Sequence, residues 1–151
     1  MNQNRAPAVS PGQKRRNIMT YYEKNEFTHV LTKEAKALEF SVEATITAEE
    51  IENIIVSSLE GASSYWCGLD NTTPEWDNEP EDLPASQYAT QLLLEGKTIV
   101  LYDIEDEDER WELTLPMILK GIGAAISRSY NITDDVDEIL QLSLFGEVVY
   151  G

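Results

Sequence analysis

The chain is poor in the residues that most often carry out chemistry. It has one cysteine, Cys67, and one histidine, His29. A single cysteine cannot form a disulfide within the chain, and one cysteine with one histidine cannot build a four-ligand zinc cluster. Nucleophilic catalysis is equally poorly supplied, because His29, at the edge of the N-terminal segment, is the only histidine available to activate Cys67. We therefore expect a protein of a reducing compartment that is not an enzyme, with no metal and no cofactor.

Long apolar runs and nucleotide-binding motifs are also absent from the sequence. No run approaches the roughly 18 apolar residues that a membrane span needs, and the basic residues near the N-terminus are not followed by the apolar segment of a signal peptide. Neither G-x-G-x-x-G nor G-x-x-x-x-G-K-[ST] occurs. These absences predict a cytoplasmic protein without a dinucleotide or P-loop site.

Basic residues are scarce beyond the first quarter of the chain. Residues 1–36 carry seven basic and three acidic residues, whereas residues 37–151 carry four basic and 25 acidic residues, a formal charge of −21. Such a charge repels phosphate backbones and anionic lipid over a Debye length of about 8–10 Å. We therefore expect no direct contact with nucleic acid or membrane, and a partner whose surface is basic.

The residues that are present predict a folded domain. The 151 residues are 42% hydrophobic and include three Trp and seven Tyr, which supply large surfaces to bury. Residues 1–25 combine Asn, Gln, Pro and Gly with a short basic cluster and show no sustained apolar period. We expect a flexible basic leader at 1–25, a weak electrostatic arm being the alternative, and a single acidic domain at 26–151.

Hydrophobic periodicity predicts an α+β fold. A small antiparallel sheet is expected, with strands near residues 37–46, 98–103, 109–113 and 147–150. Four helices should pack on it: one at about 48–60 that opens on a Thr47 capping box, a second from Pro84 to Gly96, a third capped by Thr114 that ends near Arg128, and a fourth from Thr133 to Gly146. Residues 62–83 are expected to form a long acidic loop, and such loops are often functional.

The turn of the predicted hairpin is made almost wholly of acids. Carboxylates crowded there resemble a row of phosphates, so they could occupy a basic nucleic-acid groove of another protein. A merely solvated turn is an equally good interpretation, whereas a Ca²⁺ site is disfavoured because the EF-hand pattern and its glycine are missing. The residues predicted to bind a partner are Glu105, Asp106, Glu107, Asp108 and Glu109 of the turn, with Asp70, Glu75 and Asp77 of the loop.

Aromatic residues of the predicted loop offer a second candidate site. Tyr65, Trp66 and Trp76 could stack a base or a nucleotide, with Arg110 as a phosphate contact. Core packing of Tyr65 and Trp66 is the alternative that we favour, with Cys67 as a buried small apolar residue beside them.

Several segments resemble a family of small, mostly uncharacterised bacteriophage proteins. The resemblance covers about residues 38–151 and is carried by Leu59-Glu60-Gly61, by Tyr65-Trp66-Cys67-Gly68 and by Leu144-Phe145-Gly146-Glu147-Val148-Val149-Tyr150-Gly151. It implies a phage or prophage origin and supplies no catalytic residues. The chain departs from the expected pattern at Ala62-Ser63-Ser64, where a Gly-rich link is expected, and in its basic leader.

The favoured hypothesis is an acidic phage-encoded binding protein in the host cytoplasm. It would inhibit a nucleic-acid-handling or defence effector of the host, as anti-CRISPR proteins do, by nucleic-acid mimicry; this step rests on analogy. Two alternatives stay open: a nucleotide-binding sponge or small enzyme that uses the Tyr65–Trp66 loop, and a structural phage protein. A homodimer is compatible with each of them.

Overall fold

The computed structural model describes residues 41–151, and a compact unit spans Ala48–Gly151. The predicted leader at 1–25, and the part of the predicted first strand before residue 41, lie outside the described residues. Within the compact unit, helices and a small antiparallel sheet confirm the α+β class.

The first helix of the unit, α2 (Ala48–Ser57), begins where the sequence predicts it. Ile51, Ile54 and Ile55 recur at helical spacing and are all buried. Each contributes about 1.5–3 kcal/mol of hydrophobic stabilisation when it leaves water. The helix widens into a π-helical turn at Ser58–Ala62, and the buried Ser58 hydroxyl there donates to the Val136 carbonyl at 3.0 Å.

Three further helices complete the unit. They are α3 (Ala85–Leu94), α4 (Leu115–Ser127) and α5 (Val136–Phe145), and all three were predicted. Gly96 and Gly146, with φ of 82° and 75°, follow α3 and α5 in the left-handed conformation that glycine adopts without strain. The caps differ from expectation: Thr114 occupies the N-cap of α4 without a side-chain cap bond, and Asp135, not Thr133, precedes α5.

The sheet has three antiparallel strands in the order β1-β2-β3. They are β1 (Cys67–Asp70), β2 (Ile99–Asp103) and β3 (Arg110–Leu113). Cys67 is opposite Asp103, and Tyr102 is opposite both Gly68 and Arg110. The hairpin of β2 and β3 was predicted from the sequence.

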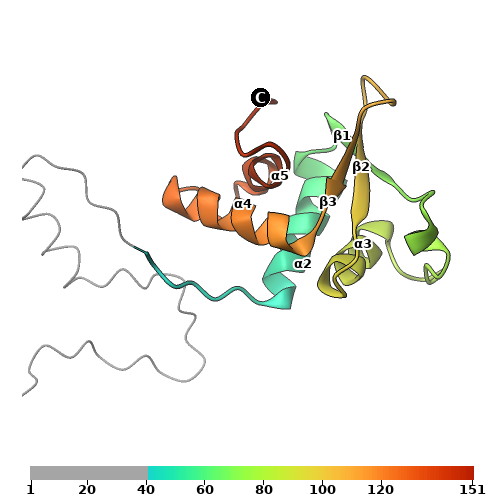
Figure 1. The fold of residues 1–151 in the computed structure, drawn as a ribbon, viewed down its shortest axis with the longest axis horizontal. Coiled ribbons are helices and arrows are strands. Elements are labelled where there is room, and N and C mark those ends of the chain that lie inside the picture. Colours follow the sequence, from blue (N-terminus) through green and yellow to red (C-terminus); the bar gives the residue numbers. More distant parts are fainter. Residues whose placement is uncertain (1–40) are drawn as a thin grey trace, which may run out of the picture. The chain divides into compact units, whose positions relative to one another are not determined.

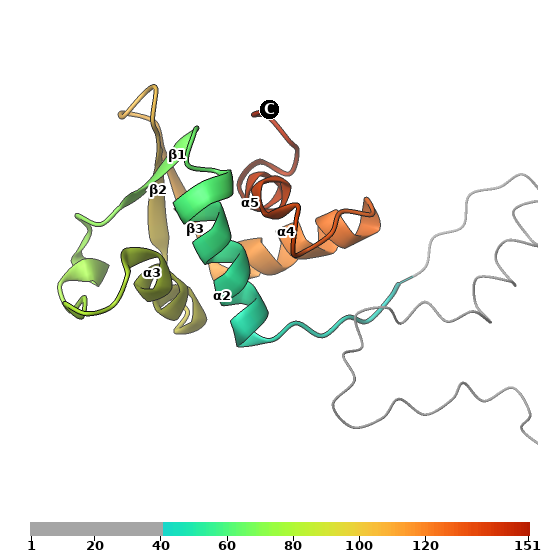
Figure 2. The same ribbon diagram turned by 180° about the vertical axis from the view of Figure 1, so that it is seen from behind.

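The core lies on one face of this sheet. Ile99, Leu101 and Leu113 are fully buried on that face, whereas the alternate side chains of β2 and β3 are half-buried or exposed. Helices α2, α4 and α5 gather on this side of the sheet, and α3 lies at the end of β2 opposite the hairpin turn (Figures 1 and 2). The hairpin turn, the start of β1 and the C-terminus all lie at the same end of the unit.

One predicted strand is wrong, another is wrong over its described part, and one strand was missed. Residues 41–46 form no strand, and Val42, expected to be buried, is 41% exposed. Residues 147–150 form no strand either. The Gln141 side chain, not a neighbouring strand, accepts the hydrogen bonds of the Val149 and Tyr150 amides. The predicted long loop at 62–83 contains β1 and a 3-10 turn, Pro74–Trp76.

Candidate functional site

The acidic turn between β2 and β3, residues 105–109, is called the acidic tip below. It is a hydrogen-bonded turn whose residues are all exposed. Asp103 Oδ1 accepts the amides of Glu105 at 2.7 Å and Asp106 at 3.3 Å, and Asp106 Oδ1 accepts the amide of Asp108 at 3.2 Å. The Glu109 amide donates to the Asp106 carbonyl at 2.9 Å. The turn contains no glycine, and its backbone is held by hydrogen bonds to the carboxylates of Asp103 and Asp106.

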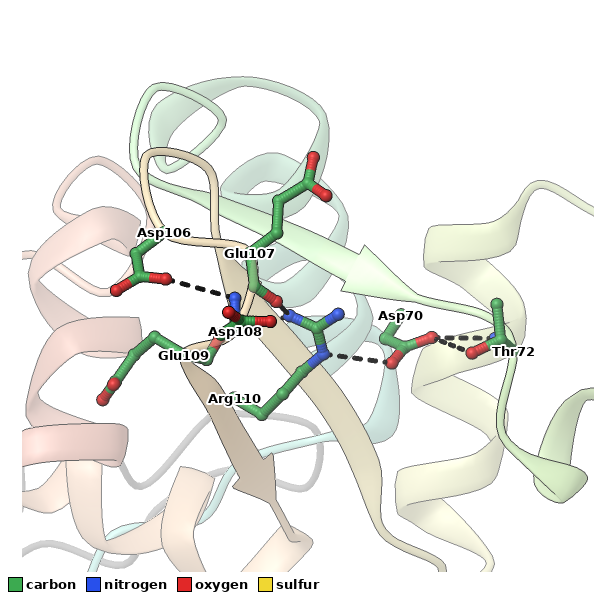
Figure 3. Close-up of polar contacts among 7 residues, drawn as sticks. All are labelled: Asp70, Thr72, Asp106, Glu107, Asp108, Glu109 and Arg110. Atoms are coloured by element: carbon green, nitrogen blue, oxygen red, sulfur yellow. Dashed lines mark hydrogen bonds and ion pairs between the residues drawn. The ribbon is translucent and has the colours of Figure 1, made fainter.

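Arg110 braces the acidic tip from below. Its guanidinium donates to the Glu107 carbonyl and, at 3.4 Å, to the Glu109 carbonyl. The same group lies 3.4 Å from the Asp70 carboxylate and 5.1 Å from the centre of the Tyr102 ring. Figure 3 shows the Arg110 guanidinium directed at the Glu107 backbone oxygen and at Asp70. Arg110 therefore supports the backbone of the tip, and within residues 41–151 it forms no ion pair with a carboxylate of the tip.

The carboxylates of the tip face solvent. In Figure 3 those of Asp106, Glu107 and Glu109 point outward in different directions. Glu109 accepts a 3.3 Å hydrogen bond from the Trp111 indole. Within residues 41–151, the ion pairs found are those of Arg110 with Asp70 and of Lys97 with Glu95, so no described cation pairs with a tip carboxylate. The tip presents five exposed carboxylates, none of which forms an ion pair within the part of the chain that the structure describes.

The three predicted loop acids do not all join this surface. Asp70 lies next to the hairpin, where the Thr72 hydroxyl and amide donate to Oδ1 at 2.6 and 2.9 Å. These hydrogen bonds, and to a smaller extent Arg110, hold the pKa of Asp70 below its ordinary value. Glu75 and Asp77 flank Trp76 in the 3-10 turn, which packs on α3, away from the tip. The predicted partner surface is therefore two acidic regions, not one.

The structure does not support the aromatic residues as a nucleotide site. Trp66 and Trp76 are 2% and 6% exposed, so neither ring offers a free face to a ligand. Trp66 belongs to the core, as we favoured, whereas Tyr65 is 53% exposed and was wrongly expected to be buried. The guanidinium of Arg110 already bonds the tip carbonyls and Asp70. The four residues predicted to stack and hold a nucleotide are thus not brought together.

Asp137 is a central polar residue that the sequence reasoning missed. Its Oδ1 accepts the Ser63 hydroxyl and the Trp66 indole N–H, each at 2.7 Å, and its Oδ2 accepts the Tyr65 hydroxyl at 3.0 Å and the Gln141 amide at 2.9 Å. Four donors satisfy this carboxylate, so it acts as a clamp between the start of β1 and α5 and not as a free general base. Its position in the first turn of α5 was the only sequence signal.

The C-terminal tail is attached to the same region. Gln141, which is fully buried, accepts the amides of Val149 and Tyr150 through Oε1, each at 2.7 Å, and donates to the Tyr150 carbonyl at 3.0 Å. The Tyr150 hydroxyl donates to Asp103 Oδ2 at 2.7 Å, which lowers the pKa of Asp103. Asp103 also shapes the acidic tip, so the tail and the tip share one carboxylate.

Cys67 is a structural residue. Its side chain is 2% exposed, and burial, with Asp137 and Asp103 nearby, raises the pKa of its thiol to about 12. A thiol of this kind stays protonated and unreactive at neutral pH.

Two further features bear on the kind of site. Within residues 41–151, no group of three or more His, Cys, Asp or Glu side chains is arranged to hold a metal ion. In the same part of the chain, no helix has both the length and the apolar character needed to cross a membrane.

No protein-family model, curated protein or solved structure matches this chain. The resemblance to small bacteriophage proteins therefore stays a prediction, and the acidic tip with its bracing residues is the candidate site that the geometry itself provides.

Proposed function

We propose that this protein acts by binding, and that the acidic tip contacts a basic surface of another protein. The observation that carries the proposal is the arrangement of Arg110, whose guanidinium bonds backbone oxygen and Asp70 while the tip carboxylates stay exposed and without a described cation. A turn whose charge merely kept the protein dissolved would not need such bracing. A turn used for recognition gains from it, because less conformational entropy is lost on binding.

The charge of the whole unit favours the same kind of partner. Residues 48–151 contain four basic and 23 acidic residues. Such a field attracts a basic surface over about a Debye length and speeds encounter with it. The field extends beyond the tip, since Glu75 and Asp77 lie in the second acidic region. We assign contact to the tip and long-range attraction to the unit as a whole.

We infer the class of partner from the sign and density of the charge of the tip. Surfaces that bind a nucleic-acid backbone are rich in Lys and Arg, and a braced cluster of carboxylates can occupy such a surface in place of phosphates. We propose a host nucleic-acid-handling or defence protein as the partner, in the cytoplasm of a bacterial host. A phage origin and an anti-CRISPR-like role are the most specific form of this proposal.

A pull-down from a bacterial lysate tests the proposal. The full chain is compared with a tip variant in which Glu105, Glu107 and Glu109 become Gln and Asp106 and Asp108 become Asn. Amides keep the size of each side chain and the acceptor oxygens of the turn, so the variant should fold. We expect the wild type to retain a basic protein that the tip variant fails to retain.

A matched control distinguishes direct contact by the acidic tip from attraction by the total negative charge. The loop variant changes the five acids of residues 75–82, which include Glu75 and Asp77 of the second acidic region. Glu75, Glu79 and Glu81 become Gln, and Asp77 and Asp82 become Asn. It removes the same total charge as the tip variant but leaves the tip intact. Retention by the loop variant supports the assignment, whereas equal loss in both variants would show that only the total charge matters.

A further inference from the structure

Two side chains hold the backbone of the acidic tip, Asp103 before it and Arg110 after it. Asp103 Oδ1 accepts the amides of the first two residues of the tip. The Arg110 guanidinium donates to two carbonyls in its second half. The order of the tip therefore depends on how firmly these two side chains are themselves held.

Each of the two side chains is fixed by a residue from outside the hairpin. Arg110 Nε lies 3.4 Å from the Asp70 carboxylate of β1. Asp103 Oδ2 accepts the Tyr150 hydroxyl at 2.7 Å. Tyr150 thus fixes Asp103 as Asp70 fixes Arg110.

The Asp103 carboxylate is bonded at both of its oxygens. Oδ1 faces the tip and Oδ2 faces Tyr150, so the planar group cannot turn without breaking a hydrogen bond. Without the Tyr150 hydroxyl, its side-chain oxygens would keep only the amides of Glu105 and Asp106, at 2.7 and 3.3 Å. Both residues are exposed, so water competes for these bonds.

The C-terminal tail, residues 147–151, is attached to the unit through two consecutive residues. The Gln141 side chain accepts the amides of Val149 and Tyr150, and the Tyr150 ring stacks on Trp66. Residues 147–149 are exposed, and the tail forms no helix or strand. A segment attached in this way opens at a lower free energy than the core does. The tail can therefore leave its place while the rest of the unit stays folded.

We propose that Tyr150 is a positioning residue of the acidic tip, and that docking of the C-terminal tail orders the tip through Asp103. When the tail is released, Oδ2 loses its donor, the carboxylate turns, and the first two amides of the tip lose a fixed acceptor. The tip keeps its five carboxylates in both states and is ordered only in the docked one. The tail thus controls the shape of the tip and not its charge.

A consequence for partner binding rests on the proposed function of the tip. A disordered turn loses more conformational entropy on binding than an ordered turn, so release of the tail weakens binding. By linkage, a partner bound to the tip favours the docked tail to the same extent. The coupling of tail and tip itself exists without a partner and is measured without one.

Backbone ¹⁵N relaxation of the full chain is the test, with Tyr150→Phe as the variant. Phenylalanine keeps the ring and its stack on Trp66, so only the hydroxyl is lost. In the wild type we expect order parameters near the rigid value of about 0.85 for the amides of Glu105 and Asp106. In the variant they should fall toward the flexible range below about 0.6, with the helices unchanged.

Tyr65→Phe is the matched control. It also removes a hydroxyl that donates to a carboxylate, that of Asp137 at 3.0 Å. The donors to Asp137 all lie outside the tip, so the order of the tip should not change. Asp103→Ala supplies a second comparison: it should disorder the tip by itself, and adding Tyr150→Phe to it should have no further effect on the tip.

Three results would overturn the proposal. They are a tip that is equally ordered in the wild type and Tyr150→Phe, an equal loss of order in Tyr65→Phe, and a further loss when Tyr150→Phe is added to Asp103→Ala. Failure of the proposed function is a separate outcome, because a tip that retains no basic protein in the pull-down leaves the relaxation result as it is.

Discussion

The ring of Tyr150, the penultimate residue, stacks on the ring of Trp66, with centroids 4.6 Å apart and planes inclined by 10°. Trp66 precedes β1 and contacts Trp111 and Phe145 as well, at centroid distances of 5.7 and 5.9 Å. The half-buried Tyr150 therefore attaches the C-terminal tail to the aromatic cluster at the end of the unit that carries the acidic tip. The Tyr150 hydroxyl connects the two through Asp103, which also accepts the first amides of the tip.

Removing the Tyr150 ring should destabilise the fold. Tyr150→Ala loses the stack on Trp66 and leaves a gap in the aromatic cluster, and we expect the free energy of unfolding to fall by about 2–4 kcal/mol. Tyr150→Phe keeps the ring and loses only the hydrogen bond to Asp103, so its effect should be smaller. Urea denaturation followed by Trp fluorescence measures both. Val149→Ala, at a 58% exposed side chain, is the control and should change stability by less than about 0.5 kcal/mol.

Asp137→Asn should also destabilise the protein. An amide offers one acceptor oxygen to the four donors that converge on Asp137, and its NH₂ group would face some of them. We expect a loss of about 2–3 kcal/mol in the free energy of unfolding. Glu138→Gln, the adjacent residue of α5, serves as control. Equal stability of the two variants would show that the Asp137 clamp contributes little.

Cys67 should resist thiol reagents in the native state. Because its thiol is buried and its pKa is about 12, a disulfide reagent at pH 8 should modify the folded chain at least about a hundredfold more slowly than the chain in urea. Rapid labelling of the native protein would mean that the end of the unit around β1 opens readily.

Alkaline pH should weaken the fold through Tyr150. Burial, then the neighbouring Asp103, raises the pKa of Tyr150 from 10.0 to about 12. A pKa that is higher in the folded state favours folding fully below pH 10, and the benefit is lost as pH rises from 10 to 12. The stability difference between wild type and Tyr150→Phe should therefore shrink over this interval. A difference that stays constant from pH 9 to pH 12 would contradict the raised pKa.

Local patterns in the sequence predict much of the fold. The spacing of Ile51, Ile54 and Ile55 predicts α2, and Gly96 and Gly146 mark the ends of two other helices. The alternation over residues 37–46 predicted a strand, which was wrong for the described residues 41–46. Period-two hydrophobicity forms a strand only where a partner strand supplies backbone hydrogen bonds. Strand β1 was missed because Gly68 interrupts its hydrophobic pattern. The Tyr102 ring of the neighbouring strand lies over Gly68, a contact that the sequence of β1 does not reveal.

The candidate site was only partly visible in the sequence. The run of five acids identifies the acidic tip in the sequence. The sequence does not show that Arg110 donates to backbone carbonyls of the tip, because a basic residue after five acids could equally well pair with their side chains. Asp137 contacts Ser63 and Trp66, which lie more than seventy positions away in the chain. Gln141 uses its side chain, in place of a strand, to accept a backbone amide. No local period encodes such contacts.

The salt dependence of partner binding tests the central claim most directly. For a basic protein retained by the wild type, the dissociation constant is measured by titration calorimetry between 0.05 and 0.3 M NaCl, for the wild type, the tip variant and the loop variant. The account predicts that wild-type affinity falls steeply with salt, that the tip variant binds at least about tenfold more weakly at low salt, and that the loop variant loses much less. Affinity that does not change with salt, or a tip variant that binds as tightly as the wild type, would contradict it.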